Sequence, residues 1–496
     1  MSTARTEDTQ RPGRLDGFFR ITERGSTLAR ELRGGLVTFF TMAYIVVLNP
    51  LIIGPVPDED GNFLGGAAEP DLAAVAAATA LVAGVMSILM GLVANYPLAL
   101  ATGLGLNAFV AFAIASEMTW ADAMGLVVIE GIIILILVIT GFREAVFRAV
   151  PKELKFAISV GIGLFITLIG LFDAGFTSRP FSASGPPLEL GVGGLLQGWP
   201  LLVFAVGLLF MVALFVRRTR GALLIGIVAT TVLAIIVEAS VNEGAQQYNP
   251  EENTVENPQG WGLTVPTWPS DWIGLPDLSL LGEFSLLGSF ERVGFVAVVL
   301  FVFTLMLADF FDTLGTMTAI GAEAGLLDED GNPPSTQRIL VVDSMAAAAG
   351  GAAAVSSNTS YIESAAGVGE GARTGLASVV TGALFLGAMF LSPLVEVVPY
   401  EAAGPALVIV GFLMMTQVAR INWDDFEIAV PAFLTIVLMP FTYSITVGIG
   451  AGFVSYALIK LVRGKLREVH VLMWITSVLF VIYFAIAPIR ALFGIE

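Results

Sequence analysis

Long, nearly uninterrupted apolar runs constrain the fold of this sequence more than any other feature. One of them, VVIEGIIILILVIT at 127–140, contains a single charged residue. A helix needs about 20 mainly apolar residues to cross the hydrocarbon core of a bilayer, whereas a transmembrane β-strand alternates apolar and polar residues. Only 13% of the 496 residues are charged, roughly half the share that soluble domains carry. The sequence therefore predicts an all-α polytopic membrane protein.

The apolar runs predict fourteen transmembrane spans. The spans are placed at 34–54, 72–95, 98–115, 120–141, 154–174, 198–216, 221–240, 293–317, 338–355, 358–371, 374–394, 404–418, 426–441 and 443–462. Residues 1–33 are assigned to a cytoplasmic N-terminal segment, and 463–496 to a basic segment followed by an apolar helix. The apolar part of that end, 471–493, is either an extra span, an interfacial helix or the true last span.

Basic residues predict the orientation of the spans, because cytoplasmic loops are enriched in Lys and Arg. Four basic clusters precede the first span, separate spans 4 and 5 and spans 6 and 7, and follow span 14. They consist of Arg24, Arg30 and Arg33; Arg143, Arg148, Lys152 and Lys155; Arg217, Arg218 and Arg220; and Lys460, Arg463, Lys465 and Arg467. The loops at 55–71 and 241–291 contain five and eight acidic residues and no basic one. Both ends of the fourteen-span unit are therefore placed in the cytoplasm, with the acidic loop 322–337 as a mild exception.

Several classes of site are excluded by residue types that are absent or misplaced. The chain has no cysteine and one histidine, His470, which excludes disulfides, thiol chemistry and His or Cys clusters for metals. A net charge of −18 argues against nucleic acid as a partner. The DEDGN turns at 58–62 and 328–332 lack the glycine that a calcium loop needs at its sixth position. No P-loop or nucleophile elbow is present, so we expect no cofactor, no bound metal and no enzyme activity.

The excess of acidic over basic residues also predicts something about the environment of the protein. The chain has four lysines against twenty arginines, and its acids are concentrated in loops. A surface rich in acid and poor in lysine suits a protein surrounded by concentrated salt, which favours a halophilic prokaryotic source. An acidic extracellular loop alone is the other explanation.

The spans divide into two sets of seven, 34–240 and 293–462, on either side of an extracellular loop at 241–292. Seven spans in each half would give the halves opposite topology, as in many secondary transporters, where interrupted spans in matching positions mark the binding site. Each half has such an interruption: TGLGLN at 102–107, and a Ser/Asn/Thr run at 356–360. Close packing of helices through small residues is the alternative explanation.

Carboxylates inside spans are the main candidates for function, because a charge at the centre of a span costs about 2.5–3.5 kcal/mol. They are Glu130, Asp309, Asp312, Asp343 and Glu363. Asp309 and Asp312 are three residues apart and share a helix face, and no lysine or arginine inside a span is identified as a partner for either. Burial without a cation favours a protonated carboxyl group, which is what coupling to a proton gradient requires.

The same acids also have structural explanations. A carboxylate that accepts hydrogen bonds from backbone amides could tether two spans, and for Glu130 this is as good an explanation as function. Asp343 is interpreted as an acid in the first turn of its helix, interacting with the helix dipole, and so outside the site. The tether explanation is weaker for Asp309, Asp312 and Glu363.

Several long motifs in order resemble the AzgA-like branch of the nucleobase–cation symporters, within the xanthine/uracil permease superfamily. They run from FFRITERGSTLARELRGGLVTFFTMAYIVVLNP (18–50) through GLGLNAFVAF (103–112), DFFDTLGT (309–316) and EAGLLDEDGN (323–332) to TSYIESAAGVGEGARTGLASVVTG (359–382). The resemblance covers nearly the whole chain, and the 471–493 stretch is the part it places least securely.

The resemblance implies an architecture and an activity. It implies a fourteen-span 7+7 inverted repeat with short antiparallel strands and half-helices in spans 3 and 10. A core domain (34–141 and 293–394) would move against a gate domain (154–240 and 404–462). It implies symport of hypoxanthine, guanine or adenine with H⁺ by alternating access in the plasma membrane. The sequence leaves Na⁺, in a salt-adapted cell, open as the coupling ion. We also expect a homodimer in the lipid bilayer.

The resemblance places the substrate between spans 3 and 10. The residues expected to bind it are Gly105, Asn107, Phe109, Asp309, Asp312, Thr359 and Glu363, and those expected to couple protons are Asp309, Asp312 and Glu363. Two other functions remain open: an anion transporter on the same inverted-repeat fold, and specificity for uracil or xanthine instead of purine bases such as hypoxanthine. An intramembrane aspartyl enzyme is disfavoured, because two aspartates on one helix differ from two that converge from separate spans.

Overall fold

The computed structural model describes residues 14–141, 150–179, 187–249, 254–329 and 332–493. Arg143 and Arg148 of the second basic cluster, and part of the second DEDGN turn, lie outside these residues. Ten helices in the described part are long and apolar enough to cross a membrane, which confirms a multi-pass helical membrane protein. They are α2 with α3 (Leu28–Met42, Ile45–Ile53), α4 (Leu72–Leu89), α6 (Trp120–Thr140), α8 (Lys152–Asp173), α9 (Trp199–Val216), α10 (Ala222–Val241), α12 (Gly294–Ala324), α15 (Gly375–Ala388, continued by a 3-10 helix to Val397), α16 (Tyr400–Met415, continued to Arg420) and α18 (Ile445–Val462).

The other four predicted spans contain shorter or interrupted helices. They are α5 (Leu104–Phe109, continued by π and 3-10 turns to Glu117), α13 (Thr336–Ala352), α14 (Ser364–Gly369) and α17 (Phe426–Thr442). A helix of at most 17 residues rises about 26 Å, less than the hydrocarbon thickness of about 30 Å. The count of fourteen spans therefore stays a prediction. The terminal apolar stretch forms helix α19 (Val471–Phe493), and a short helix α1 (Arg14–Phe19) precedes the first span.

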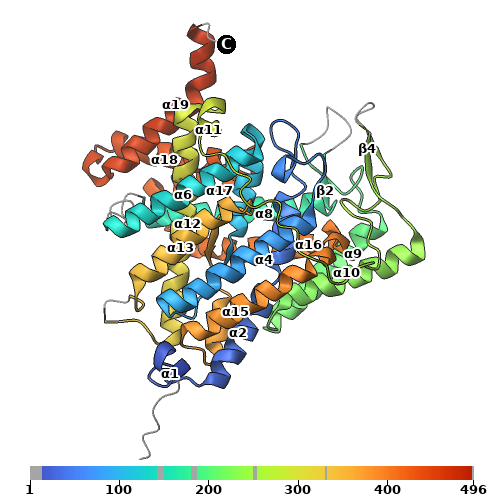
Figure 1. The fold of residues 1–496 in the computed structure, drawn as a ribbon. Helices are drawn as coiled ribbons and strands as arrows, with labels where there is room; N and C mark the ends of the chain where they lie inside the picture. The colour runs from blue at the N-terminus through green and yellow to red at the C-terminus, as the bar shows by residue number, and fades with distance from the viewer. Residues whose placement is uncertain (1–13, 142–149, 180–186, 250–253, 330–331, 494–496) are drawn as a thin grey trace, which may run out of the picture.

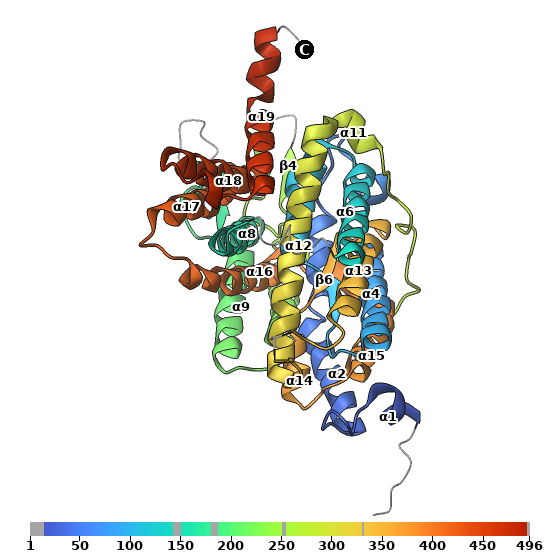
Figure 2. The ribbon, with the colours of Figure 1, turned by 90° about the vertical axis from the view of Figure 1, so that its left-hand side faces the viewer.

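The helices form two bundles, each built from two distant parts of the chain (Figures 1 and 2). The first bundle contains α2–α6 and α12–α15, and the second contains α8–α10 and α16–α19. Within them α4 packs against α15, α6 against α13 and α8 against α16. The α8–α16 crossing is close because glycines meet there: a Cβ atom on Gly163 would lie 2.8 Å from the carbonyl oxygen of Gly411. Small residues at such crossings let membrane helices approach closely.

Two short strands from distant parts of the chain meet inside the first bundle, and this antiparallel pair is called the β1–β6 crossing below. Strand β1 (Leu100–Thr102) pairs antiparallel with β6 (Asn358–Ser360), with Ala101 opposite Thr359. The pairing continues at both ends, where the Gly103 amide donates to Ser357 O and the Tyr361 amide donates to Ala99 O, each at 3.0 Å. Backbone groups at membrane depth must be satisfied by protein, and each strand satisfies the other. The strands and half-helices expected at the two interruptions are thereby confirmed.

The predicted extracellular loop at 241–292 contains a strand pair, in which β4 (Gln247–Asn249) pairs with β5 (Thr254–Glu256). A second pair, β2 (Thr177–Ser178) with β3 (Glu189–Leu190), lies in the connection between α8 and α9. Trp261 is fully buried and donates its indole N–H to Glu238 Oε2 at the end of α10 (2.8 Å). The loop is thus anchored to the second bundle.

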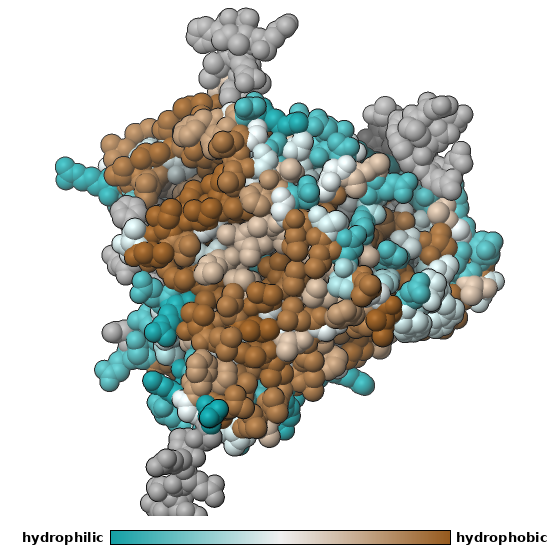
Figure 3. All heavy atoms as spheres, viewed as in Figure 1, coloured by the Kyte–Doolittle hydropathy of each residue, from teal (hydrophilic) through white to brown (hydrophobic). Residues whose placement is uncertain are grey.

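The outer surface of the bundles is largely apolar. Figure 3 shows a continuous hydrophobic area across one face of the molecule, with hydrophilic residues gathered toward its edges. Large aliphatic side chains are exposed on the helices, such as Leu209 (70% exposed) and Val216 (76% exposed) on α9. An exposed apolar area of this extent is what a lipid-facing surface requires.

Candidate functional site

Two buried amide side chains lie at the crossing of β1 and β6. Asn107, in the helix that follows β1, donates through Nδ2 to Thr102 Oγ1 (3.2 Å), while its Oδ1 has no partner. Asn358, in β6, has a partner for neither its Oδ1 nor its Nδ2. Both side chains are fully buried. Buried polar groups normally have hydrogen-bond partners. The unpartnered Asn107 oxygen can accept a hydrogen bond, and the unpartnered Asn358 amide can both accept and donate, so together they indicate a place for a polar ligand.

Glu363 stands at the N-terminus of half-helix α14, directly after β6. Its Oε1 accepts a hydrogen bond of 2.5 Å from the Tyr44 hydroxyl, which comes from the junction of α2 and α3. Asp312 on α12 is close enough to Glu363 for their carboxyl groups to interact electrostatically. The structure therefore brings the predicted residues Asp312 and Glu363 together. Tyr44 was not predicted, because a tyrosine in an apolar run carries no signal of function.

A second group of carboxylates lies deeper in the first bundle. Asp309 is fully buried, and its carboxyl oxygens make no hydrogen bond of regular geometry, although the Thr359 hydroxyl lies beside them. Asp343 and Glu130 are close enough to interact with it electrostatically. Three acids with no lysine or arginine among the contacts described for them would repel one another if all were charged. The arrangement therefore favours protonation of part of this group.

Asp343 is the centre of a hydrogen-bond chain that holds the crossing to α12 and α13. It accepts from Thr313 Oγ1 and from Ser360 Oγ, each at 2.8 Å. Thr313 in turn is 2.9 Å from Thr359 Oγ1. Either hydroxyl can be the donor of this hydrogen bond. The predicted residue Thr359 thus lies in the site, next to Asp309.

The sequence-based interpretation of Asp343 is wrong. The helix dipole acts on groups in the first turn, but α13 begins at Thr336 and Asp343 lies in its third turn, 2% exposed. It belongs to the carboxylate cluster and not to a helix end. Glu130, whose role was left open, accepts from Ser357 Oγ at 3.2 Å, while its Oε1 has no partner. It is therefore tied to the residue that precedes β6.

Phe109 and Gly105 occupy different places from the polar residues. Phe109 is 1% exposed and packs edge-on against Phe301 of α12, with ring centroids 6.4 Å apart. Gly105 faces the second bundle: a Cβ atom there would lie 2.9 Å from Ile162 of α8 and 3.6 Å from Met414 of α16. At Gly105 the half-helix that follows β1 therefore contacts α8 and α16 of the second bundle. At Phe109 the same half-helix packs against α12.

One face of α12 is open from Asp312 to the end of the helix. The exposed residues are Asp312, Gly315, Thr318, Ala319, Ala322 and Glu323. They recur every three or four residues, so they share one face of the helix. Because this face is polar and small rather than aliphatic, it is suited to water and not to lipid. The strip connects the Asp312–Glu363 pair with the end of α12 that is predicted to be cytoplasmic.

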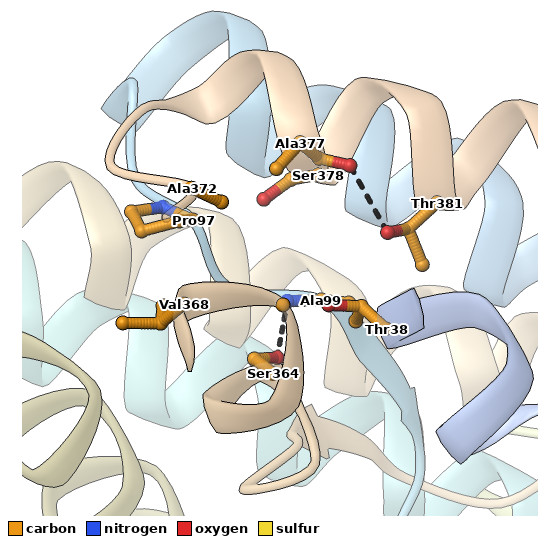
Figure 4. A pocket seen from close by; sticks show the side chains of 10 residues that line it. Thr38, Pro97, Ala99, Ser364, Val368, Ala372, Ala377, Ser378 and Thr381 are labelled. Carbon is orange, nitrogen blue, oxygen red and sulfur yellow. Dashed lines mark hydrogen bonds between the residues drawn. The ribbon is translucent and has the colours of Figure 1, made fainter. Parts of the chain in front are cut away.

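The tight crevice behind α14 is structural. It lies between α14, α2, α15 and the segment that leads into β1, and its space does not admit a water molecule (Figure 4). Ser364 Oγ accepts from the Ala99 amide (3.0 Å), and Thr381 Oγ1 donates to Ala377 O (3.0 Å). The first contact fixes α14, and with it Glu363, to the segment that leads into β1, whereas the second lies within α15. Within the described residues no group of three or more His, Cys, Asp or Glu side chains is placed to hold a metal ion.

Comparison with curated proteins gives relatives along almost the entire chain. A guanine/hypoxanthine permease of Bacillus subtilis, PbuG, is 39% identical over 469 residues, which is 94% of this chain and 98% of that protein. An adenine permease of Escherichia coli, AdeP, is 38% identical over 484 residues, 97% of this chain and 98% of that protein. Both relatives are matched from end to end, so the similarity is not confined to a shared domain.

The fold is also found in a solved structure of low sequence identity. The transmembrane domain of a cyanobacterium bicarbonate transporter, BicA, superimposes with a TM-score of 0.57 at 13% identity and covers 86% of this chain and 97% of that domain. Such a match establishes a common fold and nothing about substrate. The model of the Permease family named for xanthine and uracil permeases matches residues 29–451. The chain therefore belongs to the xanthine/uracil permease family and is a transporter, not an enzyme.

Proposed function

We propose that this permease imports purine nucleobases, such as hypoxanthine, guanine or adenine, by symport with protons. The observation that carries the proposal is the set of buried acceptor and amide groups without partners at the β1–β6 crossing, in a chain whose relatives are named for purine bases.

The chemistry of the site suits a neutral nitrogen heterocycle. A purine base presents ring N–H and amino donors beside ring nitrogen acceptors. Carboxyl oxygens of Glu363 and Asp309 would accept from the donors, and the Asn107 and Asn358 amides can serve either kind of edge. The residues placed at the site include no lysine or arginine, so an anion would find no counter-charge there. A bicarbonate transporter shares the fold, but a shared fold does not give this site the positive charge that an anion would need.

Proton coupling would follow from the same carboxyl groups. Asp309 lies among other acids, and Asp312 lies beside Glu363, so binding a proton relieves repulsion in either group. A base that accepts hydrogen bonds from a protonated carboxyl would bind more tightly when the proton is present, which is the thermodynamic definition of coupling. Sodium is the other candidate ion.

Alternating access would arise from movement of the first bundle against the second. We assign the core domain to 34–141 and 293–394 and the gate domain to 154–240 and 404–462, within fourteen spans arranged as two inverted repeats. The exposed face of α12 between Asp312 and Glu323 supports assignment of this structure to a state open to the cytoplasm. In the outward-open state the same face would pack against the gate domain.

Uptake into proteoliposomes tests the proposal. Purified protein would be supplied with radiolabelled hypoxanthine, guanine, adenine, xanthine or uracil, with an inward proton gradient, an inward sodium gradient or neither. We expect saturable uptake of one or more purine bases, stimulated by the proton gradient. No uptake of any base, or uptake abolished by excess sulfate or bicarbonate, would contradict a nucleobase permease, and stimulation by sodium alone would replace the proton.

A further inference from the structure

A second cavity lies in the second bundle, away from the β1–β6 crossing. It has a volume of about 670 Å³ and is lined by the end of α8, the starts of α9 and α16, and the loops near β2 and β4. By the predicted orientation it opens on the extracellular side. Small-molecule sites have volumes of about 300–1,000 Å³, so the cavity is large enough for a heterocycle and far larger than one ion needs.

Two buried oxygen atoms at this cavity lack partners. Glu401, in the first turn of α16, is 2% exposed; its Oε1 accepts from the Gly262 amide (3.1 Å), but its Oε2 has no partner. Thr177 Oγ1, in β2, is also buried without a partner. Both residues line the cavity. An unpaired buried polar group is costly. The carboxylate accepts hydrogen bonds, and the hydroxyl can accept or donate one, so the two at one cavity indicate a polar ligand with at least one hydrogen-bond donor.

Further lining groups extend the range of contacts. Asp173, at the end of α8, lines the cavity and interacts electrostatically with Glu401. Arg179 also lines it, with its guanidinium 5.9 Å from the centre of the Phe172 ring. The wall thus offers carboxyl acceptors, a cationic donor and an aromatic ring that has this cation over one of its faces. This combination matches the donors, acceptors and flat ring of a nitrogen heterocycle better than it matches a simple anion or cation.

The distance between this cavity and the β1–β6 crossing can be measured along helix α16, which reaches both. Met414 of α16 lies beside Gly105 of the crossing, and Glu401 is thirteen residues earlier on the same helix. At 1.5 Å per residue these positions are about 20 Å apart, so one small molecule cannot occupy both. We propose that the cavity is an outer binding site, which holds a purine base on the extracellular side before the base reaches the crossing. This inference rests on the proposed function and adds a second site to it.

Equilibrium binding of tritiated hypoxanthine to the full-length protein in nanodiscs tests the outer site. We expect wild-type protein to bind two molecules per chain. Glu363→Gln should remove the site at the crossing and Glu401→Gln the outer one, each leaving about one, and the double variant should bind none within the range tested. Because glutamine keeps an oxygen for the Gly262 amide, Glu401→Gln changes only the unpartnered atom, and the outer affinity should fall at least about tenfold.

Two further variants keep the test decisive. Thr177→Val replaces the second unpartnered oxygen by a methyl group and should also weaken outer binding. Glu283→Gln makes the same charge change at an exposed position of the extracellular loop and should leave two sites.

One bound molecule in wild type, unchanged by Glu401→Gln, would overturn the outer site while leaving the proposed function intact. Glu401-dependent binding of ²²Na⁺ without a second hypoxanthine would also overturn it. No binding and no uptake by wild type would instead refute the proposed function.

Discussion

The Glu363 carboxyl group is oriented by neighbours from distant parts of the sequence as well as by its own backbone amide. Tyr44 reaches it from the α2–α3 junction, Asp312 faces it from α12, and Ser364 next to it is fixed by the Ala99 amide. Three elements from distant parts of the sequence therefore determine where its free oxygen points. Such preorganisation lets a carboxyl group favour one ligand geometry without the cost of ordering its side chain on binding.

The Tyr44→Phe variant tests this orientation. It removes one hydrogen bond to a carboxyl group, which is worth about 1.5–3 kcal/mol when that group is charged. We expect kcat/KM for hypoxanthine uptake to fall about tenfold or more, mainly through a higher KM, with the protein still folded. Tyr456→Phe on α18, outside the site, is the matched control and should leave uptake unchanged. Equal uptake by both variants would show that Tyr44 does not position Glu363.

The Asp343→Ala variant separates two roles of that acid. If Asp343 holds the crossing, its loss leaves Thr313 and Ser360 without their acceptor, and transport should fall at least about tenfold. An acid that merely stabilised a helix end would be worth only about 0.3–1 kcal/mol and would leave the transport rate nearly unchanged. Initial uptake rates, normalised to folded protein in the membrane, distinguish the two.

Sequence rules predicted some residues of the candidate site and missed others for identifiable reasons. Asp309 and Glu363 were predicted because a carboxylate inside a span is costly and so rarely without function. Asp343 was flagged by the same rule and then misassigned, because the rule does not say which turn of a helix a residue occupies. The pairing of Glu130 with Ser357 and of Tyr44 with Glu363 depends on contacts between distant segments, which no local pattern encodes.

At the scale of elements, interruptions in the spans determine where the site lies. A continuous helix satisfies its own backbone and presents only side chains, whereas the two short strands use each other as partners and leave two half-helices pointing away from the crossing. The glycine and Ser/Asn/Thr runs signalled where the helices would break. The family resemblance, and not these runs, predicted that the breaks would form strands, since strands of three residues are too short for a period-two pattern.

The α8–α16 crossing offers a test of packing between elements. Gly163→Val adds atoms where a Cβ would already lie 2.7 Å from Met414 Cβ and 2.8 Å from Gly411 O. Overpacking of this kind costs about 1–3 kcal/mol, so the melting temperature in detergent should fall by several degrees. Gly387→Ala on α15, where a Cβ meets no atom within 4 Å, should melt no lower than wild type. A Gly163→Val protein as stable as wild type would show that the helices are not in close contact.

At the scale of the molecule, an ion pair ties the two bundles together. Glu370, at the end of α14, pairs with Arg33 of α2 (2.7 Å) and with Arg220, which lies between α9 and α10. Arg33 belongs to the first bundle and Arg220 to the second. In the alternating-access movement proposed above, one bundle moving against the other would break or shift the Arg220 contact, so this end of the half-helix would be linked to the state of the transporter.

The absence of cysteine from the sequence makes the exposed face of α12 directly measurable. We expect a Thr318→Cys variant in right-side-out vesicles to react with a permeant maleimide and not with an impermeant one. In inside-out vesicles both reagents should react, and hypoxanthine should slow the reaction by changing the population of the cytoplasm-open state. Reaction with the impermeant reagent in right-side-out vesicles alone would reverse the predicted orientation.

The most direct test of the account is proton movement driven by substrate. Wild-type protein and the Glu363→Gln variant would be reconstituted into liposomes that contain a pH-sensitive dye, and hypoxanthine would be added outside without an imposed gradient. The account predicts acidification of the interior by wild type, in proportion to the hypoxanthine taken up, and none by Glu363→Gln. Hypoxanthine uptake by wild type without any change in internal pH, or acidification by the variant equal to that by wild type, would contradict it.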